Sequence, residues 1–363
     1  MFKHKIQNII DTYFSLIRKY IPVGPQETSI GLDIGNYQCK AVEVVRTSKN
    51  VKIMNWAVEP VHDRDVLSAV RNLLKKIDSE SKNVFTGLAG QGTLIRFIRM
   101  PRMPVTQLKD SLLIESDKYF PFPSNEIYID CQIIDDGQIK DNKMSVLVAV
   151  AKKDIVKDRL QMISNLGLQA NFIGLHAIAA ANAVIEGQKE TRSISLPASV
   201  KKEAFAFLDV GEAKSTIIIF RDHGPRFTRE IAIGGKDFTQ KIMSLLSLDF
   251  QGAEKIKCSS QDKQEDVLKA CHPVLMNFVS EIRLSFDYFS SEDGARVIKI
   301  LLAGQGARLQ GLQDFLTKEL EIPVQAWAPS PDLEFSGNVD KQDFLAQADQ
   351  LCVALGLALT KND

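Results

Sequence analysis

The sequence is poor in the patterns that identify disulfide-bonded, zinc-binding and membrane-spanning proteins. Its five cysteines are scattered and no two are spaced as C-x-x-C (Cys39, Cys131, Cys258, Cys271 and Cys352). This pattern argues against a disulfide framework and a zinc site, and it indicates a reducing compartment. The five histidines form no H-E-x-x-H motif, so a metalloprotease-type zinc site is not expected either.

Long apolar runs and a surplus of charge are also missing. No run reaches the roughly 18 apolar residues that a membrane span needs, and polar residues interrupt the apolar part of the N-terminal segment, so no signal peptide is expected. Forty-five basic residues balance forty-five acidic ones, which gives no overall field that would attract a nucleic acid. The sequence therefore predicts a soluble, cytoplasmic protein of more than one domain with no nucleic-acid partner.

One short segment near the start of the chain suggests a phosphate or metal site. Residues 29–45 are predicted to form a strand that ends in Asp33-Ile34-Gly35, a turn, and a second strand that returns from Lys40. Glycine at such a turn lets a ligand approach the backbone, and the carboxylate beside it could handle a metal or a phosphate group. Taken alone the signal is weak, because Asp-x-Gly turns also close many hairpins for structural reasons.

The chain contains a second copy of this arrangement. Residues 204–211 end in Asp209-Val210-Gly211, and a returning strand follows at 215–220. In both halves a third strand, a helix and a strand that leads into Ala-Gly-Gln-Gly come next, at 89–92 and at 303–306. The matching order indicates an internal duplication of about half the chain each. Two lobes that each present an Asp-x-Gly turn to the cleft suit a charged ligand held between them.

The other segments are assigned around the two lobes. A strand-helix-strand-strand pattern, whose single helix is predicted over 105–119, forms an α+β module inserted into the first lobe. A helix is also predicted over 308–320, directly after the second Ala-Gly-Gln-Gly. The predicted divisions are 1–27, an N-terminal helix and linker; 28–92 and 152–186, the first lobe; 93–151, the inserted module; 187–202, a linker; 203–249 and 295–363, the second lobe; and 250–294, a helical insertion.

The N-terminal residues 2–21 carry an apolar stripe at helical spacing and a mostly basic polar face. A basic amphipathic helix of this kind can lie on an anionic membrane surface. It can equally pack on its own domain or on a partner helix, and this second interpretation is favoured because packed helices are far commoner.

Five segments carry a resemblance to a known family. On these segments, and over residues 29–359, the sequence resembles the actin-like ATPase superfamily, most closely the PilM family of type IV pilus assembly and next the FtsA division family. The resemblance implies an actin-like (ribonuclease H-like) duplicated two-lobe α/β fold, with an inserted module similar to the SHS2-type subdomain. The segments are Gly31–Gly35 with Lys40–Glu43, Met100–Pro104, Glu115 with Lys118–Pro123, Ile231–Gly235 with Phe238 and Thr239, and Ala253–Lys257.

The resemblance implies that ATP or ADP binds with Mg²⁺ between the lobes. Asp33 matches an aspartate that holds Mg²⁺ through water, Asp209 matches its counterpart in the second phosphate loop, and Lys40 matches a lysine that reaches the phosphates. The other matching positions are Gly35 and Asn36 in the first loop, Gly211, Ser215 and Thr216 in the second, Glu254 and Lys257 for ribose and base, and Gly304 and Gly306 in the adenosine loop. The structural alternatives are turn-capping aspartates, a solvated lysine and an ordinary helix-surface ion pair.

The sequence departs from that family pattern where hydrolysis is concerned. The first loop continues as Asn36-Tyr37-Gln38 without hydroxyl residues, and Gln305 interrupts the glycines of the adenosine loop. Residues 167–183 contain no Asp or Glu that could orient an attacking water, and His176 stands at one of the matching positions. The sequence therefore predicts binding of nucleotide with slow hydrolysis or none, and it assigns no catalytic residue.

The resemblance to the PilM family implies an adaptor peripheral to the inner membrane, working with other components of the pilus inner-membrane complex. Its partner would be the short cytoplasmic N-terminal peptide of a PilN-like protein, bound in a groove between the first lobe and the inserted module. Residues 100–103 and 119–123 are candidate walls of that groove, or else part of the module's own core. An FtsA-like protein, expected to continue into an amphipathic membrane helix, and a sugar kinase, expected to place an aspartate between the lobes, are the alternatives.

Overall fold

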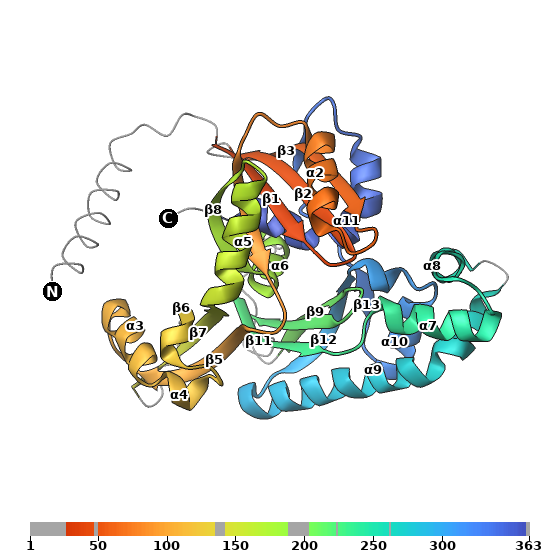
Figure 1. The fold of residues 1–363 in the computed structure, drawn as a ribbon. Coiled ribbons are helices and arrows are strands. Elements are labelled where there is room, and N and C mark those ends of the chain that lie inside the picture. Colours follow the sequence, from red (N-terminus) through yellow and green to blue (C-terminus); the bar gives the residue numbers. More distant parts are fainter. Residues whose placement is uncertain are drawn as a thin grey trace.

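Two sheets form the two lobes of the molecule (Figure 1), and they share one order of five strands, to which the first sheet adds the edge strand β14. The computed structural model of the chain describes residues 27–46, 50–134, 142–187, 203–222, 224–260 and 263–360. The first sheet has the order β14-β3-β2-β1-β4-β8, and the second has the order β11-β10-β9-β12-β13. In each, an antiparallel hairpin and a third strand are followed by parallel strands, which confirms the duplicated α/β fold predicted from the sequence.

The first lobe holds most of the N-terminal half of the chain. Along α2 the buried side chains recur at helical spacing and pack against the sheet (Ala69, Val70, Leu73 and Ile77). The elements of this lobe are β1 (Glu27–Ile34), β2 (Gln38–Arg46), β3 (Val51–Pro60), α2 (Val66–Ile77), β4 (Asn83–Leu88), α5 (Lys153–Asn165), β8 (Gln169–Leu175) and α6 (His176–Gly187).

The second lobe repeats this order and adds a long helix. The helix α9 runs under the second sheet (Figure 1), and its apolar stripe, which includes Cys271, Leu275 and Phe278, is buried in the core of that lobe. The elements are β9 (Glu203–Val210), β10 (Ser215–Arg221), β11 (Gly224–Ile231), α7 (Gly235–Leu246), α8 (Phe250–Cys258), α9 (Gln264–Asp293), β12 (Arg296–Ala303), the 3₁₀ turn η5 (Gln305–Arg308), α10 (Leu312–Leu320) and β13 (Val324–Ala326).

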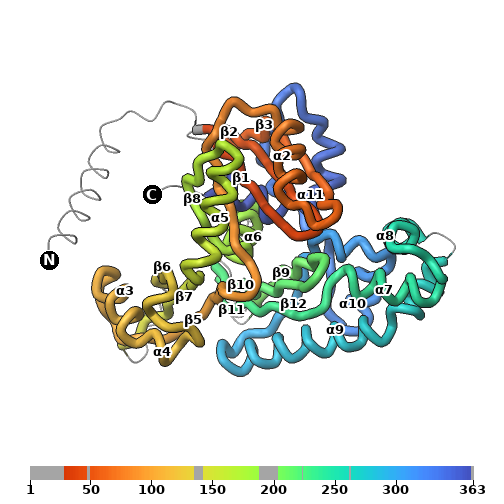
Figure 2. The backbone as a smooth tube through the Cα atoms, in the orientation of Figure 1, coloured from red at the N-terminus to blue at the C-terminus, as the bar shows by residue number. Residues whose placement is uncertain are grey.

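The last elements of the chain return to the first lobe, which differs from the predicted assignment of 295–363 to the second. The short strand β14 (Glu334–Phe335) pairs with β3, and the helix α11 (Lys341–Ala358) packs on β1, β2 and α6. Figure 2 shows the blue C-terminal segment beside the red and orange strands. The physical reason is that α11 is buried along nearly its whole C-terminal half. A helix that is apolar on more than one side must be covered on more than one side, and the first sheet and α6 supply the cover that the second sheet alone does not.

The inserted module is a three-stranded sheet of order β5-β7-β6 beside the two lobes. Its order of strand, helix, strand, strand is the predicted one, but the helix predicted over 105–119 is two helices, which meet at Glu115. Met100, Leu108, Leu112 and Phe120 lie in a core that belongs to the module itself. The elements are β5 (Thr93–Pro101), α3 (Val105–Ile114), α4 (Ser116–Tyr119), the 3₁₀ turn η1 (Ser124–Glu126), β6 (Ile127–Ile134) and β7 (Lys143–Lys152).

Some sequence predictions fall on residues that the structure does not describe. The amphipathic helix of 2–21 and residues 188–202 of the predicted linker are among them. In the part of the chain that is described, none of the helices combines the length and the apolar character that crossing a membrane requires.

Candidate functional site

A cavity of about 560 Å³ lies between the lobes, where the two duplicated hairpin turns face each other. Asp33, Asn36 and Lys40 line it from the first lobe, and Asp209 and Thr216 line it from the second. The sequence predicted all five of these residues as parts of one site, and the fold brings them to one cavity.

The two turns have the same local geometry, and each requires a glycine. A Cβ atom at Gly35 would lie 2.7 Å from the carbonyl oxygen of Gln38, and a Cβ atom at Gly211 would lie 2.8 Å from the carbonyl oxygen of Lys214. The offset of three residues is identical in the two lobes. Both glycines are therefore needed to close their hairpins, whether or not a ligand approaches the backbone there.

A lysine lies between the two aspartates of the turns. Asp33 and Lys40 pair across the hairpin of β1 and β2, and the Lys40 Nζ lies 3.1 Å from Asp33 Oδ2. Burial by itself would raise the pKa of Asp33, but the charge of Lys40 and the hydrogen bond from its Nζ oppose burial, and the net effect is a lowered pKa. Burial by itself would lower the pKa of Lys40, and the charges of Asp33 and Asp209 outweigh it and raise that pKa. Asp33 and Lys40 therefore form a buried ion pair.

Asp209 is the carboxylate of the set whose charge is least compensated. Burial raises its pKa from 3.8 to about 6, with Lys40 opposing the shift and the negative charge of Asp33 adding to it. No hydrogen bond or ion pair holds its side chain within the described residues, which leaves its oxygens available to a ligand in the cavity.

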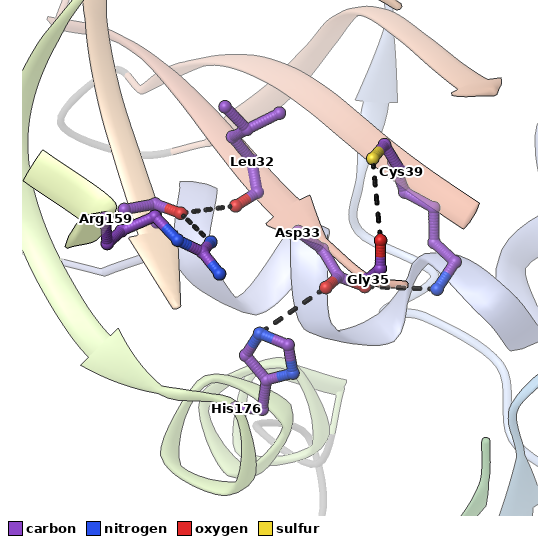
Figure 3. Close-up of polar contacts among 8 residues, drawn as sticks. Leu32, Asp33, Gly35, Cys39, Arg159 and His176 are labelled. Atoms are coloured by element: carbon purple, nitrogen blue, oxygen red, sulfur yellow. Dashed lines mark hydrogen bonds and ion pairs between the residues drawn. The ribbon is translucent and has the colours of Figure 1, made fainter. Parts of the chain in front are cut away.

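Two basic residues that the sequence did not assign to binding also line the cavity. His176 begins α6, and its Nε2 atom lies 3.4 Å from Asp33 Oδ1 in a direction that makes no hydrogen bond (Figure 3). Arg159, on α5, donates from Nη1 to Thr86 Oγ1 at 3.0 Å. Burial lowers the pKa of His176, so its neutral form is favoured.

The two glycines of the predicted adenosine loop pack against the second hairpin turn, and Gly304 also lines the cavity. A Cβ atom at Gly304 would lie 2.4 Å from both Asp209 Oδ1 and the carbonyl oxygen of Val210, and Gly304 has a φ of +94°. The glycine is therefore required where η5 crosses the second hairpin turn. Gly306 packs on the same turn, while Ser215 is fully buried and donates to the carbonyl oxygen of Ile233 at 2.7 Å, so it does not face the cavity.

Glu254 and Lys257 lie beside the cavity rather than in its wall. Lys257 is fully buried, and its Nζ donates to Glu254 Oε1 at 2.5 Å and to Thr239 Oγ1 at 3.1 Å. A Cβ atom at Gly235 would lie 3.2 Å from the same nitrogen. These contacts differ from the solvated helix-surface pair that the sequence left open as an alternative.

Buried polar atoms without a hydrogen-bond partner gather in this cavity. Of the five such side-chain atoms found in the described residues, four belong to residues that line it: Gln38 Oε1, His176 Nε2, Glu212 Oε1 and Gln350 Oε1. Native proteins leave few buried polar groups unsatisfied. Atoms of this kind take their hydrogen bonds from ordered water or from a polar ligand in the cavity.

Comparison with known proteins agrees with this architecture. The chain is 23% identical to a chain of the PilM-PilN type IV pilus biogenesis complex, with a TM-score of 0.78, and the match covers 92% of this chain and 98% of that one. The ethanolamine utilization protein EutJ from Carboxydothermus hydrogenoformans is 15% identical, with a TM-score of 0.52 and coverage of 95% and 94%. At these identities the likeness establishes the actin-like fold and nothing further.

The family assignment comes from the sequence itself. The model of the type IV pilus assembly protein PilM matches residues 31–362, which include both lobes, the inserted module and every predicted site residue. This chain therefore belongs to the PilM family of actin-like type IV pilus assembly proteins.

Proposed function

We propose that this protein is an adaptor that binds ATP or ADP with Mg²⁺ between its lobes. The observation that carries the proposal is the set of four unsatisfied polar atoms in the cavity that also contains Asp33, Lys40 and Asp209. A magnesium nucleotide brings what this set lacks, namely the donors of its ribose hydroxyls, base amino group and metal-bound water for the orphaned oxygens, and a divalent cation for the uncompensated carboxylate of Asp209.

The residues fit that ligand in a defined way. Lys40 would reach the phosphates as a point charge, and Asp33 and Asp209 would hold Mg²⁺ through water. Among the described residues no group of three or more His, Cys, Asp or Glu side chains could hold a metal ion by itself, so the ion would depend on phosphate oxygens for part of its coordination. When bound, Mg²⁺ supplies neutralisation of the phosphate charge.

Nucleotide binding is tested directly on the purified full chain. The protein is denatured and the released nucleotide is identified by chromatography, and nucleotide-free protein is then titrated calorimetrically with ATP in magnesium and in EDTA. Binding that weakens in EDTA is expected. The absence of both released nucleotide and heat of binding would refute the proposal.

We propose further that hydrolysis is slow or absent. Efficient hydrolysis needs a group that orients or deprotonates the attacking water, and the residue that begins α6 is His176, whose nitrogen faces the carboxylate of Asp33. Phosphate release measured over hours on the nucleotide-loaded protein should stay near the background rate. Steady turnover at the rate of a sugar kinase would contradict this.

We also propose that a PilN-like N-terminal peptide docks between the first lobe and the inserted module, and that the protein thereby lies at the inner membrane with other pilus components. Membership in the PilM family and the likeness to a chain of the PilM-PilN type IV pilus biogenesis complex support this. Met100 and Phe120 are excluded as groove walls because they are 3% and 5% exposed in the module's core. Arg102, Pro121 and Pro123 remain at the surface.

The peptide proposal has a simple binding test. A fluorescent synthetic peptide with the N-terminal sequence of the PilN-like protein is titrated with the full chain, and its anisotropy is recorded with ATP, with ADP and without nucleotide. A saturable rise is expected, whereas a scrambled peptide of the same composition should give none. Equal signals from both peptides would refute specific docking.

A further inference from the structure

Arg159 is a partly buried cation at the cavity that has no partner of opposite charge among the described residues. Arg159 donates a single hydrogen bond, to the neutral hydroxyl of Thr86, and no carboxylate in the described part of the chain lies within ion-pair distance of it. The Thr86 hydroxyl in turn donates to the carbonyl oxygen of Leu32 at 3.0 Å, which anchors the arginine to the centre of the first sheet (Figure 3). A partly buried guanidinium with one neutral partner is unfavourable unless an anion completes it.

The other partly buried cations of the cavity wall are already engaged. Lys40 is paired with Asp33, and Lys214, which reaches the cavity from the second lobe, is paired with Glu230. Arg159 is therefore the partly buried cation of the cavity whose charge is not used inside the protein, whereas Arg96, which also lines the cavity, is exposed to solvent. Burial lowers the pKa of Arg159 from its ordinary value, with Asp33 opposing the shift, which is a further sign that the site disfavours this charge when no ligand is present.

The position of Arg159 indicates which part of a nucleotide it would meet. Arg159 lies on α5, whereas Glu254 and Lys257 lie on α8, and Figure 1 shows α5 and α8 on opposite sides of the first sheet's strand β1. Asp33 and Lys40 lie opposite each other at the end of β1 and near the start of β2. If the nucleoside lies on the α8 side, the phosphate chain extends past Lys40, and its last phosphate comes nearest to Arg159.

We propose that Arg159 recognises the terminal phosphate of a nucleoside triphosphate and so distinguishes a triphosphate from a diphosphate in this cavity. The inference rests on the nucleotide binding proposed above and adds to it the residue that sets the preference. A planar guanidinium can donate two parallel hydrogen bonds to phosphate oxygens. The hydrogen bond to Thr86 uses only one of its five N–H groups, so donors remain for the ligand.

Calorimetric titration of the full chain with Mg-ATP and with Mg-ADP tests the proposal. Arg159→Gln removes the charge, and Arg71→Gln, the same change at an exposed position of α2, is the matched control. We expect Arg159→Gln to weaken ATP binding by roughly tenfold to a hundredfold, as for the loss of charge-assisted hydrogen bonds, and to change ADP binding less than twofold. The Arg71→Gln protein should bind both nucleotides as the wild type does.

Other results overturn the proposal in recognisable ways. Equal weakening of ATP and ADP, or no change in either, would show that Arg159 does not read the terminal phosphate, while the proposed nucleotide binding would stand. A wild-type protein that binds neither nucleotide would overturn both.

A second variant keeps the test decisive if Arg159→Gln does not fold. Arg159→Lys keeps the positive charge but not the two-pronged geometry, and we expect its ratio of ATP to ADP affinity to fall by about fivefold. An unchanged ratio in Arg159→Lys would refute recognition by the guanidinium fork. Because Arg159→Gln removes an uncompensated cation, the nucleotide-free variant should unfold at a temperature at least as high as that of the wild type. If Arg159 served only to stabilise the fold, the variant would unfold at a lower temperature.

Discussion

At the scale of single residues, the site is a set of buried charges that balance only in part. Asp33 and Asp209, from the two duplicated turns, both interact electrostatically with Lys40, but Lys40 donates a hydrogen bond only to Asp33. Removing one member of a buried pair costs far more than the pair contributes, because the other charge is left unpaired in a medium of low polarity. The stability of the nucleotide-free protein should therefore depend strongly on Lys40 and on the charge of Asp209.

The Lys40 ion pair and an exposed pair of the same type give a matched comparison. Lys40→Met leaves Asp33 unpaired at 6% side-chain exposure and should lower the free energy of unfolding at pH 7 by about 3–5 kcal/mol. Lys76→Met breaks the Lys76–Glu59 pair, in which the lysine side chain is 55% exposed, and should cost about 1 kcal/mol or less. Urea denaturation of the two variants checks this, and equal costs would contradict the buried-pair interpretation.

Asp209 predicts a pH dependence with a definite sign. Its pKa is about 6 in the folded protein, above the 3.8 of an ordinary aspartate, so the folded state holds a proton that the unfolded chain has already released. Stability should fall as pH rises from about 4 to 6, by about 3 kcal/mol in all at 1.36 kcal/mol per pKa unit. Asp209→Asn should thus stabilise metal-free protein at pH 7 and have little effect at pH 4. A pH-independent difference from the wild type would contradict the assignment.

The sequence predicted the part of the site that is local in the chain. Asp33 and Lys40 lie seven residues apart, and hairpin pairing places them directly opposite each other, so one motif contains both. Arg159 escaped prediction because a helix pattern does not tell which polar side chain will face a cleft. Its partner Thr86 is 73 residues away in the sequence, and only the assembled sheet brings the two together.

At the scale of elements, the strands were predicted well and the helix ends less well. Alternating apolar residues and Asp-x-Gly turns define the hairpins locally, and the structure forms both of them. The helix predicted to begin at residue 308 begins at Leu312, because Gly311 has a φ of +85° and separates it from the 3₁₀ turn. The position of α11 was missed, since an apolar helix does not specify which of two similar sheets it will cover.

The crossing of α11 and α6 is close enough to reverse an ordinary mutational effect. Glycine to alanine within a helix usually stabilises by about 1 kcal/mol. At Gly356 a Cβ atom would lie 1.7 Å from the carbonyl oxygen of Ala179, so Gly356→Ala should instead destabilise, by about 1–3 kcal/mol or more. The control is Gly187→Ala, at the end of α6, where the nearest atom would be 3.5 Å away. Thermal unfolding measures both, and a stabilised Gly356→Ala protein would refute the close crossing.

At the scale of the whole molecule, the two lobes share a hydrophobic core. One cluster contains Val42 and Phe85 of the first sheet, buried residues of α6 and α11, and Phe207 and Leu301 of the second sheet. Arg308 of η5 adds a two-pronged ion pair to Asp349 of α11, at 2.7 Å from Nε and 2.6 Å from Nη2. A core shared in this way couples the two lobes energetically, so neither should unfold while the other keeps its structure.

The two tryptophans of the chain allow that coupling to be measured, because each lobe has one. Trp56 lies on β3 and packs against the shared core, and Trp327 follows β13 and lies within the core at 5% exposure. Trp56→Phe and Trp327→Phe each leave a single fluorescent reporter, in the second and the first lobe respectively. In each variant the fluorescence midpoint in urea should coincide with the midpoint of far-ultraviolet circular dichroism, as a two-state transition requires. A fluorescence transition that precedes the loss of secondary structure in either variant would mean that the lobes unfold separately. The shared core would then be too weak to transmit a nucleotide-dependent change from one lobe to the other.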